Sequence, residues 1–220
     1  MLHGAEPGNE QFKAYFEDGS EEIFQTWDYA NIYSHPHLYE ILFCDTLKLG
    51  AYKNLGILLA RNVDADETKL SVLDVACGSG LMGKFLIKET ALNIDHLVGV
   101  DIAPEAIAAL NRDCPGVYSE AMTVDEFYNR QEQHKSHFNC LAVSGGAYKI
   151  GEIGCKKYID LLDNDSYILF NLAMDENDEG RRNMLKLMDN EAKLISKTQY
   201  FHRQLAGGKK VYHEAFLYKK

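Results

Sequence analysis

Between Leu70 and Leu172, short apolar segments typical of buried β-strands alternate with segments whose apolar residues have helical spacing. The strands are expected at residues 70–76, 97–101, 117–122, 138–143 and 167–172. The intervening helices are expected at residues 81–90, 105–112, 125–133 and 154–162. Strands that alternate with helices of this length favour a parallel sheet with helices on both faces.

The end of the chain has a different pattern. Residues 193–202 and 210–218 are both strand-like, and Ala206, Gly207 and Gly208 lie between them, which indicates a hairpin. The predicted fold class is therefore α/β: a doubly wound, Rossmann-like sheet of seven strands, mostly parallel, with an antiparallel C-terminal edge hairpin.

The segment before the first strand has no such alternation. Apolar residues recur at helical spacing over 38–61, where Gly50 is expected to divide the helix. Residues 1–20 are polar and expected to be flexible, and removal of residues 1–10 is expected to be harmless. We predict one domain over 1–220, in which 1–61 form an N-terminal helical lid and 62–220 the cofactor-binding core.

Charge and cysteine content narrow the functional classes. The chain has 23 Lys and Arg against 33 Asp and Glu, a net charge of −10 that repels nucleic acid and anionic membranes. Its partner is therefore expected to be a small molecule, and the chain a monomer or homodimer. Five cysteines without a CxxC pair favour a reducing, cytoplasmic location, and no metal-binding spacing is present.

The most informative segment, residues 72–83, reads VLDVACGSGLMG. Gly78 and Gly80 lie where the first expected strand turns into a helix, so the backbone can approach a ligand and offer free N–H groups. Asp101 ends the next strand, 21 residues beyond Gly80, where a carboxylate can accept hydrogen bonds from a ribose diol.

Two readings of this turn are open. Gly78, Gly80 and Gly83 match the dinucleotide pattern G-x-G-x-x-G, which supports an NAD(P)-dependent oxidoreductase as the alternative. However, Asp74 stands inside the strand end, where a carboxylate suits a ligand with a cationic amino group better than a pyrophosphate. No Tyr-x-x-x-Lys pair occurs in the chain either.

Residues 72–83 resemble the first motif of class I S-adenosylmethionine-dependent methyltransferases of the small-molecule type, with Ala76 in place of the first glycine. Residues 98–104 resemble the second motif, 138–146 the fourth strand and its loop, and 27–33 the opening segment of many members. The resemblance implies S-adenosylmethionine as cofactor, S-adenosylhomocysteine as product and no metal. It also implies these cofactor contacts: Tyr33, Asp74, Ala76, Cys77, Gly78, Ser79, Gly80, Asp101, Ile102 and Ser144, with Met122 or Thr123 at the adenine.

The methyl acceptor is harder to predict. Methyl transfer to O, N, C or S relies mainly on proximity, with help from a general base where the acceptor must lose a proton. Tyr148, His35 and His37 are the candidate catalytic residues; for Tyr148 a packing role is an equal alternative, and the histidines are otherwise exposed loop residues. His202 and His213, on the hairpin, are expected to be surface or rim residues. A protein that binds the cofactor without transferring methyl is a further alternative.

Overall fold

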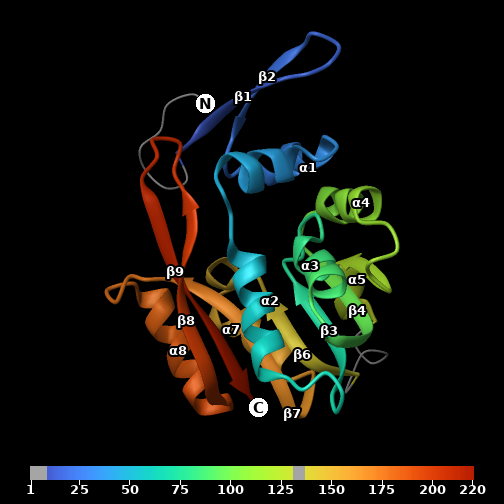
Figure 1. Cartoon of the computed structure of the whole chain (residues 1–220), viewed down its shortest axis with the longest axis vertical. Coiled ribbons are helices and arrows are strands. Elements are labelled where there is room, and N and C mark those ends of the chain that lie inside the picture. The colour runs from blue at the N-terminus through green and yellow to red at the C-terminus, as the bar shows by residue number, and fades with distance from the viewer. Residues whose placement is uncertain (1–8, 131–136) are drawn as a thin grey trace.

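The computed structural model describes residues 9–130 and 137–220, and its main feature is a seven-stranded sheet in the order β5-β4-β3-β6-β7-β9-β8 (Figure 1). The strands are β3 Lys69–Val75, β4 Asn93–Asp101, β5 Glu120–Thr123, β6 Phe138–Val143, β7 Leu162–Ala173, β8 Lys193–Gln204 and β9 Lys210–Lys219. The first five run parallel, and β9 pairs antiparallel with both β7 and β8. The predicted fold class is confirmed.

Side chains of the central strands alternate between two buried layers. In β6, Leu141 and Val143 belong to the core on one face, and Cys140 and Ala142 to the core on the other. Helices α5 (Val124–Asn129), α7 (Ala147–Ile159) and α8 (Glu179–Glu191) cover the first face, and α2 (Ala51–Asn62) and α3 (Leu81–Glu89) cover the second. Helix α4 (Pro104–Asp113) packs against β4 and β5.

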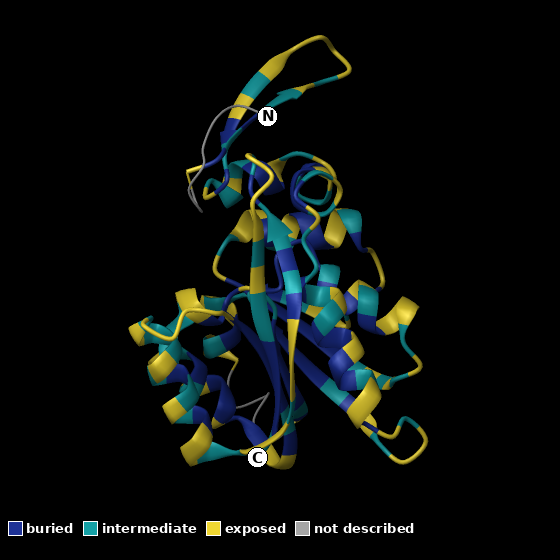
Figure 2. Cartoon of the chain, turned by 60° about the vertical axis from the view of Figure 1, so that its left-hand side comes forward, coloured by how far each residue is buried: buried dark blue, intermediate teal, exposed yellow. Residues whose placement is uncertain are grey.

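The N-terminal segment is not all helical, and this part of the prediction is wrong. A hairpin of β1 (Gln11–Tyr15) and β2 (Glu21–Gln25) precedes α1 (Tyr29–Ser34) and the π-helix η1 (Glu40–Thr46). Phe12 and Phe24 face each other across this hairpin and are buried, while most neighbouring side chains are not (Figure 2). One buried pair in two short strands leaves a pattern too sparse to be recognised in the sequence. Residues 1–8 lie outside the described residues.

The N-terminal segment is held to the C-terminal hairpin. The backbone N–H of Gly50 donates to the carbonyl of His202 at 2.8 Å, and that of Gln204 donates to the carbonyl of Leu47 at 2.8 Å. Glu10 is fully buried and accepts hydrogen bonds from the guanidinium of Arg203 at 2.8 Å on each carboxylate oxygen. Residues 9–50 therefore cover the carboxyl ends of the parallel strands, where the glycine-rich turn lies.

Three helices differ from the prediction. Helix α7 begins seven residues earlier than expected, at Ala147, and Gly151 interrupts it with a left-handed φ of 69°. Helix α8 was not among the expected helices: the charged residues at 175–182 favour either a solvated face or a helix start, and α8 buries just Met184 and Met188, one turn apart. The helix expected over 125–133 corresponds to α5, Val124–Asn129, and residues 131–133 lie outside the described part of the chain. None of the described helices is long and apolar enough to cross a membrane.

Candidate functional site

The turn from β3 to α3 is built from left-handed backbone conformations. Ala76, Gly78 and Gly80 have φ values of 58°, 54° and 89°. Alanine tolerates a left-handed φ poorly, which explains why the methyltransferase motif that this turn resembles has glycine at the position of Ala76. The Ala76 methyl group fits because residue 146 is glycine: a Cβ there would lie 2.5 Å from the Ala76 Cβ.

Gly83, the third glycine of the dinucleotide-like pattern, makes room for a tyrosine. A side chain on Gly83 would collide with the ring of Tyr118, whose hydroxyl accepts a hydrogen bond from the Gly83 N–H at 3.0 Å. The same hydroxyl donates to Oδ2 of Asp74 at 2.6 Å. Close packing therefore accounts for the third glycine without requiring a dinucleotide.

Asp74 is a fully buried carboxylate with one unsatisfied oxygen. Tyr118 occupies Oδ2, whereas Oδ1 has no hydrogen-bond partner among the described residues. Burial, together with the nearby charge of Asp101, outweighs the Tyr118 hydrogen bond and raises the pKa of Asp74 to about 7. An unpaired buried carboxylate oxygen is costly, so this position favours a ligand that supplies a cationic donor.

Asp101 organises the loops at the ends of β3 and β4. Its Oδ2 accepts a hydrogen bond from the N–H of Gly78 at 2.9 Å, and its Oδ1 accepts one from the N–H of Ala103 at 3.0 Å. Each carboxylate oxygen has a second lone pair, so these bonds leave Asp101 able to accept from a ligand. Ile102, which follows it, is strongly exposed at the cavity rim.

A cavity of about 550 Å³ lies over these carboxyl ends. Of the twelve residues expected to bind the cofactor, nine line it: Tyr33, Asp74, Ala76, Cys77, Gly78, Ser79, Asp101, Ile102 and Ser144. Burial raises the pKa of the Cys77 thiol well above its usual value, which keeps the thiol neutral. The cavity gathers segments that are distant in the sequence but meet at one edge of the sheet, as expected for an α/β fold.

The other three expected cofactor residues do not line the cavity. Gly80 packs beneath Leu110 and Tyr118, and Met122 is buried in the core. Thr123 caps α5 by accepting a hydrogen bond from the N–H of Glu126. Val124 and Tyr128, on α5, line the cavity at this point instead. The helix begins so soon after β5 that its first residues, and not the last of the strand, reach the cavity.

None of the three candidate catalytic residues lines the cavity. Tyr148 is 66% exposed, with its ring beside Gly180. The His35 ring stacks on Phe16 with centroids 4.9 Å apart, and its Nε2 lies 3.5 Å from Glu22. His37 is exposed and lies beside Asp113, the last residue of α4. The structure therefore does not bring these residues together with the glycine-rich turn.

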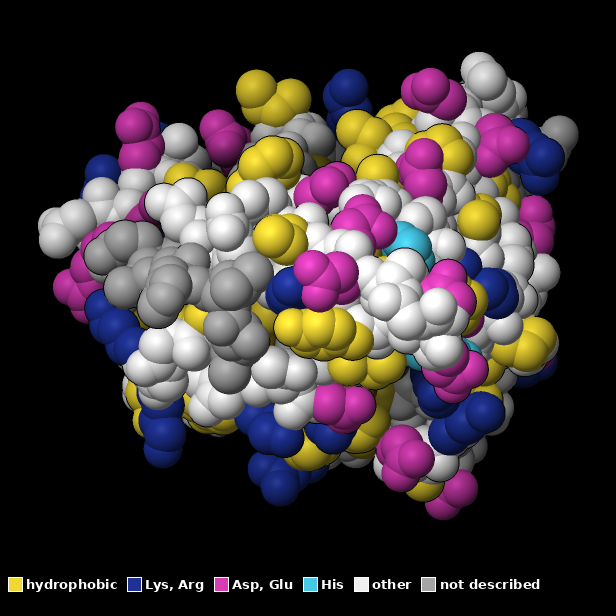
Figure 3. All heavy atoms as spheres, turned by 90° about the horizontal axis from the view of Figure 1, so that it is seen from above, with side chains coloured by type: hydrophobic (Ala, Val, Ile, Leu, Met, Phe, Trp, Pro, Cys, Tyr) yellow, Lys and Arg dark blue, Asp and Glu magenta, His cyan; other side chains and the backbone are white. Residues whose placement is uncertain are grey.

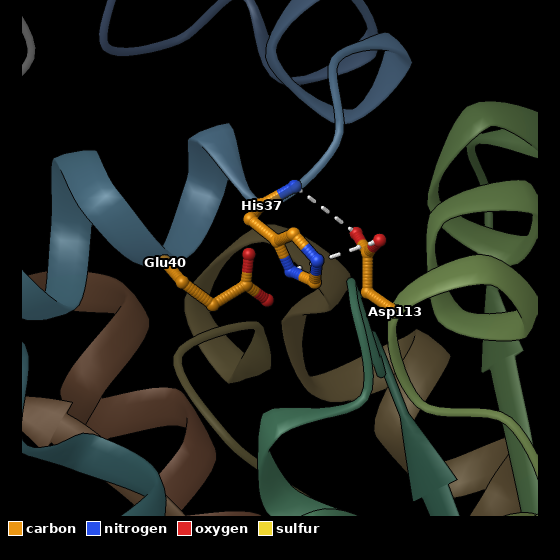
Figure 4. Close-up of side chains that lie close together, drawn as sticks. All are labelled: His37, Glu40 and Asp113. Atoms are coloured by element: carbon orange, nitrogen blue, oxygen red, sulfur yellow. Dashed lines mark hydrogen bonds and ion pairs between the residues drawn. The ribbon is translucent and has the colours of Figure 1, made fainter.

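His37, Glu40 and Asp113 form the one group of potential metal ligands in the described part of the chain (Figure 4). The His37 ring points toward Asp113, and Nδ1 lies 3.8 Å from its Oδ1. However, Arg112 binds both oxygens of Asp113 at 2.8 and 2.7 Å, and its positive charge opposes a metal ion there. We assign no metal to this group.

The roof of the cavity is aromatic. Tyr33 stacks on Tyr39 with centroids 5.0 Å apart, and Tyr39 stacks on Phe43 at 4.5 Å. Tyr29 lies beside Tyr33 at 6.2 Å and beside Phe43 at 5.9 Å. These four rings, here called the aromatic roof, give the cavity an aromatic, largely apolar lining beside the glycine-rich turn.

Sequence reasoning missed several polar residues of the cavity, namely Lys149, Lys157, His202 and Arg203. His202, expected at the surface or the rim, is 9% exposed and lines the cavity, so a free surface position is excluded for it. Its ring stacks on that of the half-buried His213 with centroids 3.6 Å apart. Burial lowers the pKa of His213 to about 4 and that of His202 well below its usual value, so both are neutral at pH 7. The N-terminal segment covers this end of the hairpin, which a pattern confined to the hairpin does not reveal.

His213 also connects to the loop after β6. Its Nδ1 lies 3.0 Å from Nδ2 of Asn171, and Oδ1 of Asn171 accepts a hydrogen bond from the N–H of Gly145 at 2.8 Å. Gly145 and its neighbours line the cavity. The buried polar groups of the hairpin therefore help to fix the loop that closes the cavity beside β6.

Comparison with solved structures identifies the fold. The chain is similar to an O-methyltransferase from Bacillus cereus in complex with SAH, with a TM-score of 0.55 and 13% identity over 77% of this chain and 80% of that one. It is also similar to magnesium protoporphyrin IX methyltransferase from Synechocystis PCC 6803 with bound SAH. Here the TM-score is 0.56, with 13% identity over 80% of this chain and 85% of that one. The chain has the class I methyltransferase fold.

Other similarities within this methyltransferase fold involve different substrates. A putative RNA methyltransferase from Pyrococcus horikoshii has a TM-score of 0.57 and 14% identity over 77% of this chain and 83% of that one. Protein arginine N-methyltransferase 1 of Saccharomyces cerevisiae is 36% identical over 75 residues, which are 34% of this chain. The match spans only 20% of that yeast protein. No family model matches the sequence.

Proposed function

We propose that the protein is an S-adenosylmethionine-dependent methyltransferase that acts on a small molecule. The buried, unpaired Oδ1 of Asp74 in the cavity wall is the observation that supports this most directly. The cationic amino group of the methionine moiety would satisfy this oxygen, whereas a dinucleotide pyrophosphate would be repelled by it. The solved relatives with SAH are consistent with this choice of cofactor.

The cavity residues fit the rest of the cofactor. Asp101 has lone pairs available for the ribose hydroxyls, and Ile102, Val124 and Tyr128 offer apolar surface for the adenine. The cofactor supplies a methyl group that is already electrophilic. The chain has only to bind it, exclude water beneath the aromatic roof and hold the acceptor in line, which can contribute about 7–11 kcal/mol through proximity.

Two features support a small acceptor. The cavity is only about 550 Å³, and the N-terminal segment and C-terminal hairpin cover it. On the face seen in Figure 3, acidic side chains are interspersed with basic and apolar ones, and the net charge of −10 opposes binding of nucleic acid.

The free state of all five cysteines supports a reducing, cytoplasmic location.

The first experiment is calorimetry with SAH and with NADH. We expect SAH to bind and NADH not to bind; the reverse would favour the oxidoreductase alternative. Asp101→Ala is expected to weaken SAH binding by about 2 kcal/mol, because charge-assisted hydrogen bonds and the loop order they maintain are lost. Asp95→Ala, at an exposed position near the start of β4, is the matched control and should leave SAH affinity unchanged.

The second experiment tests transfer. The protein is incubated with methyl-labelled cofactor and, separately, with a small-molecule extract, a protein fraction and RNA. Label in the small-molecule fraction supports the proposal, and label in protein or RNA contradicts the small acceptor. SAH binding without transfer to any fraction would favour a cofactor-binding protein that is not a methyltransferase.

A further inference from the structure

The charged side chains that line the cavity differ in whether they have an oppositely charged partner. Asp74 and Asp101 are the acidic side chains that line it, and the basic ones are Lys149, Lys157 and Arg203. Arg203 is already neutralised by the buried carboxylate of Glu10. Lys157 is exposed at the rim, 5.8 Å from the ring centroid of Tyr128. Lys149 is exposed as well, but its ammonium group faces the aromatic roof at Tyr29 and makes no ion pair with a described residue.

The break in α7 places Lys149 in the cavity. Gly151, with its left-handed φ, separates the first turn of α7 from the rest of the helix, and Lys149 lies in that turn. Its Nζ lies 4.1 Å from the ring centroid of Tyr29, at the edge of the aromatic roof. Within residues 9–130 and 137–220, Lys149 makes no ion pair and its side chain makes no hydrogen bond.

We propose that Lys149 binds an anionic group, a carboxylate or similar acid, on a flat methyl acceptor that packs beneath the aromatic roof. This inference rests on the proposed function, because it assigns the substrate class of the same cavity. The ring of Tyr29 holds the ammonium group in place. The adjacent aromatic side chains line the cavity and offer apolar contact area to a planar, unsaturated molecule. An acid there supplies the missing counter-charge.

The position of Lys149 favours the acceptor over the cofactor as the source of the anion. The methionine end of the cofactor is expected at Asp74 and the ribose at Asp101. The ammonium group of Lys149 lies over the ring of Tyr29, in the N-terminal segment that covers the cavity, and not at the glycine-rich turn, where the methionine moiety is expected. This placement favours the acceptor.

The test measures binding to SAH-loaded protein by calorimetry. The ligands are benzoate, salicylate and indoleacetate, each compared with its uncharged carboxamide. We expect at least one acid to bind wild-type protein at least fivefold more tightly than its amide, and Lys149→Met to remove that preference. Lys186→Met, at an exposed lysine on α8 that does not line the cavity, should retain it.

A parallel titration with SAH and with methylthioadenosine, which lacks the amino acid part, separates the two sources of the anion. SAH affinity of Lys149→Met within twofold of wild type supports the acceptor. A weaker affinity for SAH but not for methylthioadenosine would assign Lys149 to the cofactor and overturn the proposal. So would the absence of any preference for acids, or a preference that survives in Lys149→Met. Failure of wild-type protein to bind SAH would refute the proposed function itself.

Discussion

The hydroxyl of Tyr33 lies 2.5 Å from the position that a Cβ on Gly78 would occupy. The aromatic roof thus contacts the glycine-rich turn directly. Gly78 was expected to be glycine so that the backbone approaches a ligand. The structure adds a second reason, because any side chain at position 78 displaces the roof.

We predict that Gly78→Ala weakens SAH binding at least tenfold, because the methyl group collides with Tyr33 and strains a φ of 54°. Adding Tyr33→Phe to this variant removes the hydroxyl and should recover at least part of the lost SAH affinity. Calorimetry on the single and double variants measures this. Gly116→Ala is the control: Gly116 has a φ of 72° with no atom within 4 Å of its Cβ position, so it carries the strain without the collision.

Asp74→Asn is predicted to stabilise the ligand-free protein while weakening SAH binding. The amide carbonyl can still accept from Tyr118, and no buried charge remains unpaired, a gain of about 1–3 kcal/mol. The folded-state pKa of about 7 exceeds the usual value of 3.8, so wild-type stability falls as pH rises from about 4 to 7. The increase in the free energy of unfolding of Asp74→Asn over wild type should therefore be small at pH 4 and fully developed above pH 7. Urea denaturation at several pH values tests this, with Asp95→Asn as an exposed control.

The same carboxyl group should make cofactor binding depend on pH. Only ionised Asp74 attracts a cationic amino group, so SAH affinity is expected to decline as pH falls below about 7. Methylthioadenosine has no such group, and its affinity should not follow this titration. An identical pH dependence for both ligands would contradict an interaction between Asp74 and the amino group.

Tyr118→Phe removes a hydroxyl that serves two partners. It leaves the N–H of Gly83 unbonded and deprives Asp74 of its donor, which should lower the free energy of unfolding by about 1–3 kcal/mol. Because the Tyr118 hydrogen bond lowers the pKa of Asp74, the midpoint of pH-dependent SAH binding should also move upward. A loss of stability without this movement would contradict the electrostatic role of Tyr118.

Glu10→Ala should destabilise the protein by about 3–5 kcal/mol, because Arg203 would remain as an uncompensated, largely buried charge. Glu10 also accepts a hydrogen bond from the N–H of Ala206 at 2.9 Å. Lys13→Ala breaks the more exposed pair with Glu21 and should leave the free energy of unfolding almost unchanged. Removal of residues 1–10, expected above to be harmless, would delete Glu10 and should therefore lower stability as well. Urea denaturation of the two variants provides the measurement.

The parallel strands were predictable because their two-sided burial leaves continuous apolar segments. Strand β6 has the predicted bounds, Phe138–Val143, and β3 differs by a single residue at each end. The β1–β2 hairpin was not predictable on the same basis. Its stability depends on Phe12 and Phe24 packing against residues of α1 and η1, a contact that no local pattern records.

The same distinction applies to the site. Asp74, Gly78 and Asp101 lie at the ends of predictable strands, so their proximity followed from the sheet. Lys149 and Arg203 reach the cavity through a break in α7 and through the folding of the hairpin against the N-terminal segment. His35, His37 and Tyr148 were plausible by residue type, but their side chains point to other contacts.

The ion pair between Glu10 and Arg203 joins residues 193 positions apart in the chain. Loop closure over such a distance carries a large entropic cost, and contacts of high sequence separation slow folding. During synthesis the first strands emerge long before β8 and β9 exist to receive them. We therefore expect the parallel sheet to form first and the cavity to close last, so that a nascent chain lacking the final hairpin has a sheet but no enclosed binding site.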